Sequence, residues 1–161
     1  LQGQAGLWKE SDALLKSSLA KSHSPYYLMS GLAGNARKQG RTAEALGWYE
    51  QAFAKSVGPA TRLQWGAAYF TALVELAPTD AARIEKTAAQ LIQEAGSQQG
   101  AFYERSARSM QRVGKMLGTW NGQGQHQAVV DRLRDQLAPV CAKLPPADAQ
   151  KATCESVLKK A

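Results

Sequence analysis

The sequence is poor in the residues from which catalytic and metal sites are built. It has two cysteines and two histidines in 161 residues. The cysteines, Cys141 and Cys154, do not form a CxxC pair and no histidine cluster accompanies them, which disfavours a zinc site and a thioredoxin-type redox motif. A P-loop, a nucleophile elbow and an HExxH motif are also missing. We therefore expect no cofactor and no enzymatic activity from this chain.

Long hydrophobic runs are missing as well. No apolar stretch is long enough to span a bilayer, so we expect neither a transmembrane helix nor a membrane partner. The opening residues, LQGQAGLWKESD, lack the basic start and the apolar stretch of a signal peptide, and they lack an initiator Met. We expect Leu1 to be an internal residue of a longer precursor.

The charge balance is basic, with a formal net charge of +7 and a sequence pI of about 9.6. A basic balance suits nucleic acid, anionic membranes or acidic protein partners. The basic residues are scattered along helical segments, and no zinc-finger spacing, RNA-binding sheet motif or basic arm is present. We therefore expect a protein or peptide partner, for which an acidic surface is one candidate, and no nucleic acid.

The hydrophobic periodicity is helical nearly throughout, and the strict alternation of a strand is missing. Gly40 suits the left-handed residue after a helix, while Thr42 and Asp80 suit the N-caps of the helices that follow them. The pattern predicts an all-α chain of about eight helices in one domain, 1–161. Its predicted parts are an N-terminal helix (1–20), three helical hairpins (25–57, 60–96 and 102–143) and a C-terminal helix (147–160).

The stretch GRTAEALGWYEQAFAKS, from Gly40 to Ser56, places small residues and a ring at helical steps. Ala45, Tyr49 and Ala52 share one helix face, where small side chains let two helices approach closely. This spacing resembles a tetratricopeptide repeat, and the matching residues are Leu32, Ala33, Gly40, Ala45, Tyr49 and Ala52. The resemblance implies antiparallel hairpins stacked as a right-handed superhelix. The alternative is a non-repetitive helical bundle, because helical pairs share the same packing rules.

A second resemblance covers almost the whole chain. The segments ALLKSSLAKSHSPYYLMSGLAGNARKQGRTAEALGWYEQA and GPATRLQWGAAYFTALVELAPTDAARIE resemble the helical C-terminal region of bacterial thioredoxin-fold proteins of the disulfide isomerase and reductase type. The resemblance implies a periplasmic or secreted location and a thioredoxin-like domain earlier in the same precursor. It carries over no catalytic residue, because the CxxC lies in the part that this sequence lacks.

Two groups of residues are candidates for binding a partner. In tetratricopeptide proteins the first helices of successive hairpins line a groove for extended peptides, and the corresponding residues here are Tyr27, Ser30, Arg37, Lys38 and Gln64. The second group follows one helix face at spacings of three and four residues: Arg105, Arg108, Arg112 and Lys115. Either these four cations attract an acidic peptide or protein surface, or they are the solvated face of an amphipathic helix.

Cys141 and Cys154 flank a Pro-Pro turn that makes their helices antiparallel, so the two thiols can meet. We favour a disulfide, since the implied compartment is oxidising. The alternative is a pair of buried free thiols that act as small apolar groups. We expect a non-catalytic interaction domain that belongs to a secreted thioredoxin-fold protein, and the alternative is a structural or oligomerisation module without a peptide ligand.

Overall fold

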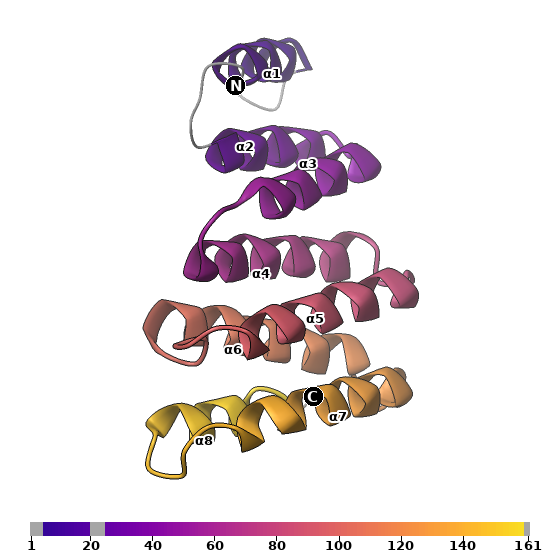
Figure 1. The fold of residues 1–161 in the computed structure, drawn as a ribbon. Helices are drawn as coiled ribbons and strands as arrows, with labels where there is room; N and C mark the ends of the chain where they lie inside the picture. The colour runs from indigo at the N-terminus through magenta and orange to yellow at the C-terminus, as the bar shows by residue number, and fades with distance from the viewer. Residues whose placement is uncertain (1–4, 20–24, 160–161) are drawn as a thin grey trace. The chain divides into compact units, whose positions relative to one another are not determined.

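The computed structural model describes residues 5–19 and 25–159. These residues form eight α-helices and no strand, which confirms the predicted all-α fold class (Figure 1). The helices are α1 (Ala5–Leu19), α2 (Pro25–Lys38), α3 (Thr42–Lys55), α4 (Pro59–Leu76), α5 (Ala81–Gly96), α6 (Glu104–Asn121), α7 (Gln127–Ala142) and α8 (Ala149–Ser156). Within this part of the chain, no helix combines the length and the hydropathy that crossing a membrane requires.

The helix ends follow local chemistry, with two corrections to the sequence prediction. Gly40 has a φ of 75°, as expected, and the Asp80 carboxylate caps α5 by accepting a hydrogen bond from the amide of Arg83. Thr42 was expected to cap α3, but it is the first helical residue, and Arg41 precedes it without a side-chain cap. The C-terminal helix was expected over 147–160, but α8 ends at Ser156. Its start is displaced because Asp148 caps it through the amide of Gln150.

The described helices divide between two compact units, residues 1–57 and 58–161. The first unit holds α1, α2 and α3. Ala45 and Ala52 of α3 are fully buried, so the small residues do permit the close approach of α2 and α3, whereas Tyr49 is half-buried. α1 lies against α2, where the buried amide of Asn35 donates hydrogen bonds to Ser11 Oγ and Asp12 Oδ1, both at 2.9 Å.

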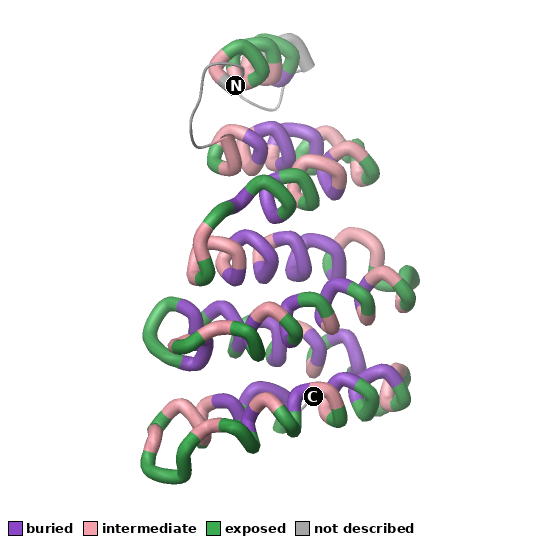
Figure 2. Tube along the Cα trace, in the orientation of Figure 1, coloured by how far each residue is buried: buried purple, intermediate pink, exposed green. Residues whose placement is uncertain are grey.

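The second unit holds α4 to α8. α4 is buried along most of its length (Figure 2), and it contacts both α5 and α6. We expected α6 and α7 to pair as a third hairpin. Instead α6 lies chiefly against α4, and α7 lies chiefly against α5, so each of the two helices buries its apolar face on an earlier helix. The short α8 contacts both α6 and α7.

Polar side chains join the helices of the second unit. Trp120 Nε1, at the end of α6, donates to the carbonyl oxygen of Pro78 at 2.8 Å, and the Trp120 ring stacks on His126 with centroids 3.6 Å apart. Gln136 of α7 donates to the carbonyl oxygen of Ala89 on α5 at 2.9 Å. These bonds hold α6 and α7 in register with the α4–α5 pair, and so fix which face of α6 meets solvent.

Candidate functional site

The four cations predicted on one helix face lie on α6, and all four side chains are exposed. We call Arg105, Arg108, Arg112 and Lys115 the cationic strip. The opposite face of α6 is buried and includes Met110, Val113 and Leu117. α6 is an 18-residue helix with a single acidic residue, Glu104, in its first turn. The helix thus presents positive charge along one face with no acidic side chain between the cations.

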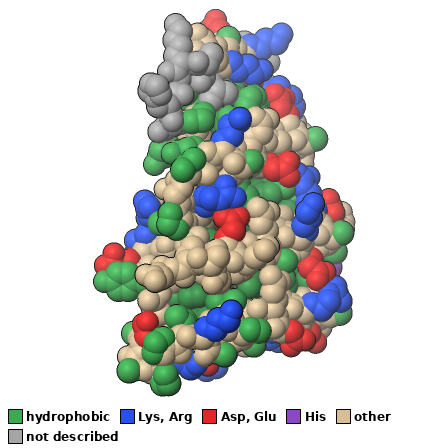
Figure 3. Space-filling model, viewed as in Figure 1, with side chains coloured by type: hydrophobic (Ala, Val, Ile, Leu, Met, Phe, Trp, Pro, Cys, Tyr) green, Lys and Arg blue, Asp and Glu red, His purple; other side chains and the backbone are tan. Residues whose placement is uncertain are grey.

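The cationic strip has no ion-pair partner in the part of the chain that the structure describes. Among residues 5–19 and 25–159, no carboxylate forms an ion pair with any of its four side chains. Over the face of the molecule seen in Figure 3, by contrast, basic and acidic side chains are interspersed. An unpaired guanidinium keeps its five donors available to a carboxylate, which it can bind through two parallel hydrogen bonds.

Two arginines on other helices of the second unit each bind a carboxylate through two hydrogen bonds. Arg62 of α4 holds Glu94 of α5 through two hydrogen bonds, of 2.6 and 2.9 Å. Arg132 of α7 holds Glu85 of α5 in the same way, at 2.8 and 2.7 Å. Hydrogen bonds from these guanidinium groups lower the pKa of Glu94 and of Glu85 below the ordinary value for a glutamate. The strip therefore differs from Arg62 and Arg132 in having no carboxylate partner among the described residues.

The predicted groove residues are divided between the two units. Tyr27, Ser30, Arg37 and Lys38 lie on α2, and Gln64 lies half-buried on α4. Tyr27 is 64% exposed, and its ring lies 5.8 Å from that of Tyr26. Lys38 is exposed, but its Nζ lies 5.4 Å from the ring centroid of the buried Trp8 on α1. Lys38 thus contributes a cation–π contact that helps to hold α1 on α2.

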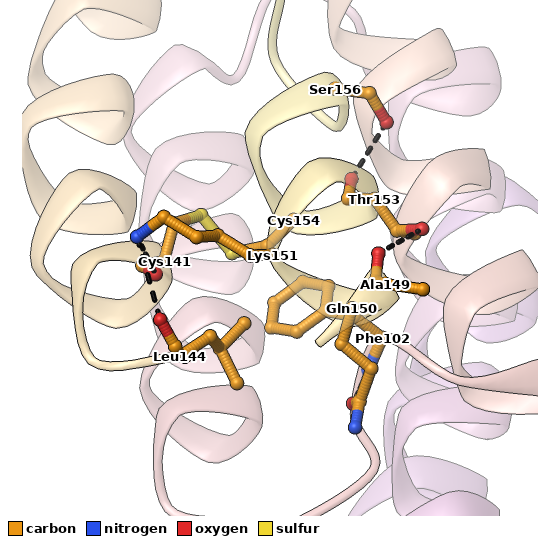
Figure 4. Close-up of a disulfide and its surroundings, with 9 residues drawn as sticks. All are labelled: Phe102, Cys141, Leu144, Ala149, Gln150, Lys151, Thr153, Cys154 and Ser156. Atoms are coloured by element: carbon orange, nitrogen blue, oxygen red, sulfur yellow. Dashed lines mark hydrogen bonds between the residues drawn. A yellow bond between two sulfur atoms is a disulfide. The ribbon is translucent and has the colours of Figure 1, made fainter. Parts of the chain in front are cut away.

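Cys141 and Cys154 form a disulfide between the end of α7 and α8 (Figure 4). Cys154 is fully buried and Cys141 is 4% exposed. Lys151 Nζ donates to the carbonyl oxygens of Cys141 and Leu144, at 3.3 and 3.5 Å, so it satisfies acceptors at the end of α7 (Figure 4). The bond and this lysine together tie α8 to α7.

The sequence did not point to a cleft beside the cationic strip. This cleft has a volume of about 500 Å³ and lies between α6 and residues 156–159, which are the last residue of α8 and the turn after it. Its lining consists of Gly114, Lys115, Gly118, Thr119, Ser156, Val157 and Lys159. Lys115 belongs both to the strip and to the cleft. The pair of glycines four residues apart is the sequence signal that could have indicated a close approach to α6 at this point.

Comparisons with known proteins give no further assignment. No family model, no curated protein and no solved structure matches this chain. Within the described residues, no group of three or more histidine, cysteine, aspartate or glutamate side chains is placed to hold a metal ion. The cationic strip and the adjoining cleft are therefore the features on which a functional proposal rests.

Proposed function

We propose that this chain is a non-catalytic protein–protein interaction domain whose cationic strip binds an acidic surface of a partner protein. The observation that carries the proposal is the row of four exposed cations on α6, none of which pairs with a carboxylate of the described residues. The paired arginines Arg62 and Arg132 would have to give up a carboxylate before binding another one. The strip has no such cost, and its charge also accelerates the encounter with an acidic partner.

The resemblance to bacterial thioredoxin-fold proteins supports a more specific placement. In this proposal the chain is the C-terminal accessory part of a periplasmic or secreted protein with a thioredoxin-like domain, and it contributes to substrate choice. The disulfide between Cys141 and Cys154 is compatible with an oxidising compartment. Sequencing the gene upstream of the codon for Leu1 tests this placement, because an encoded signal peptide and CxxC domain support it and their absence contradicts it.

Charge reversal tests the binding role of the cationic strip. The probe is a fluorescein-labelled polyglutamate peptide, and its binding is followed by fluorescence anisotropy at low and high salt. We expect R108E/R112E to weaken binding by about tenfold or more at low salt, with a smaller loss at high salt, because salt screens exposed charges. The matched control is K86E/K143E, which makes the same charge change at two exposed lysines outside the strip.

The control variant should keep the affinity of the wild-type protein to within about twofold, as distant exposed charges interact weakly at ordinary ionic strength. Equal losses in the two variants would mean that net charge alone governs binding, and would refute the strip as a site. If the chain binds a single-stranded oligonucleotide of the same length and charge more tightly than the peptide, the partner is a nucleic acid and not a protein. A tight dimer in sedimentation with the strip covered would favour the oligomerisation module instead.

A further inference from the structure

The cleft between α6 and residues 156–159 is built by close main-chain packing. A Cβ atom placed on Gly114 would lie 1.8 Å from the carbonyl oxygen of Val157, so the two backbones meet where only glycine fits. Val157 and Leu158 are both buried, and Arg134 Nε donates to the carbonyl oxygen of Leu158 at 2.9 Å. The wall opposite α6 is therefore fixed by contacts within the fold, and the cleft exists before any partner binds.

The lining of the cleft combines carbon surface with positive charge. Its exposed surface is mostly apolar, and the carbon atoms come from Val157, the methyl group of Thr119 and the methylene stems of the two lysines. The hydroxyls of Thr119 and Ser156 donate to carbonyl oxygens of their own segments, at 3.2 and 2.6 Å. Among the described residues that line the cleft, none is acidic. Within residues 5–19 and 25–159, the charges that line the cleft are therefore the ammonium groups of Lys115 and Lys159.

The cationic strip leads directly to this cleft, because Lys115 is shared between them. A volume of about 500 Å³ lies within the range of pockets that hold small ligands, and it is sufficient for an aliphatic side chain. An acidic segment that lies along the strip would carry its next residues to the cleft. There an apolar side chain meets carbon surface, while acidic neighbours of that side chain meet the two lysines.

We propose that the cleft seats an aliphatic side chain from an acidic segment of the partner protein, as an anchor beside the cationic strip. The inference rests on the proposed function, because the strip must hold the segment before the cleft can select within it. The positive charge of the strip attracts any acidic segment, whatever its other side chains are. The cleft supplies the discrimination, since burying a branched apolar side chain gains free energy that a polar one of similar size does not.

Two fluorescein-labelled peptides of equal length and equal glutamate number test the anchor. Their central residue is leucine in one and serine in the other. We expect the wild-type chain to bind the leucine peptide about tenfold more tightly, the effect of burying most of one leucine side chain. T119W places a large ring at an exposed, cleft-lining position of α6. It should abolish the preference for leucine without lowering the affinity for the serine peptide. Q111W, at an exposed position of the same helix outside the cleft, is the matched control and should retain the preference.

The outcomes separate this inference from the proposed function. Equal affinity of the wild-type chain for both peptides refutes the anchor and leaves the cationic strip in place. A leucine preference that survives in T119W also refutes the anchor, because the preference would then arise elsewhere. Failure of the wild-type chain to bind either peptide refutes both proposals. If T119W does not fold, T119F takes its place, and equal affinities of the wild-type chain for the two peptides refute the anchor without either variant.

Discussion

The main chain of Gly114 lies directly against the carbonyl oxygen of Val157. A side chain at residue 114 would begin 1.8 Å from that oxygen, well inside any permitted contact, so α6 and the residues after α8 are packed backbone to backbone. Because Val157 is also buried, the two segments cannot separate locally without exposing apolar surface. This contact fixes one wall of the cleft.

Gly114→Ala should therefore destabilise the protein. The new methyl group meets backbone, which cannot rotate away, and overpacking of this kind costs about 1–3 kcal/mol. Urea unfolding followed by circular dichroism measures the loss. The matched control is Gly47→Ala in α3, where an added Cβ atom meets nothing within 4 Å and the helix gains about 0.5–1 kcal/mol. Equal effects of the two substitutions would contradict the close approach at Gly114.

The disulfide between Cys141 and Cys154 predicts that denatured, unreduced protein from an oxidising compartment contains no thiol that iodoacetamide can alkylate. The residues lie 13 positions apart, and closing so short a loop stabilises by about 3 kcal/mol, so C141A/C154A should lower the unfolding free energy by about that amount. Mass spectrometry after treatment with iodoacetamide counts the alkylated cysteines. Two alkylated cysteines per chain would disprove the bond.

The ion pair between Arg62 and Glu94 should make stability depend on pH. Hydrogen bonds from Arg62 lower the pKa of Glu94 in the folded state, so in acid the unfolded chain binds this proton before the folded one does. The stabilisation is complete above the unfolded value of about 4.5 and is lost as the pH falls through the lower, folded value. At pH 7, E94Q should cost about 1 kcal/mol, since both side chains are partly exposed.

The difference between wild type and E94Q should shrink as the pH falls below about 4.5. Thermal unfolding between neutral and acidic pH measures it. E155Q is the control, since Glu155 is exposed and forms no ion pair in the described part of the chain. A difference between wild type and E94Q that stays constant with pH would show that the Arg62 pair does not stabilise the fold.

Asn35 should hold α1 on α2. Its amide donates to Ser11 and to Asp12, and its own side chain is almost completely buried. Loss of these bonds in Asn35→Ala should let the amides of α1 exchange with deuterium about tenfold faster, while α3 is unaffected. Ser30→Ala, at a half-buried position of the same helix, is the control. Unchanged exchange in α1 would mean that apolar contacts alone dock it.

Helix positions were predictable from the sequence because they depend on local signals. Periodicity located the helices, Asp80 and Gly40 marked helix boundaries, and spacing alone placed Arg108 and Arg112 on one face. Which helices touch was not predictable, because it depends on distant partners. Arg62 and Glu94 lie 32 residues apart, and nothing local distinguishes the paired Arg132 from the unpaired Arg112. Lys159 was missed for the same reason, since only the packing of Val157 on Gly114 brings it to the cleft.

The sequence contains only the two cysteines that the disulfide joins. Four cysteines can form two disulfides in three different pairings, whereas the two cysteines of this sequence allow one pairing. Oxidative folding of residues 1–161 by themselves therefore has no mispaired product within one molecule, and these residues require an oxidant but no isomerase to correct errors among their own cysteines. The competing product is a disulfide between two chains, so the yield of correctly closed protein should fall as the concentration of folding chains rises.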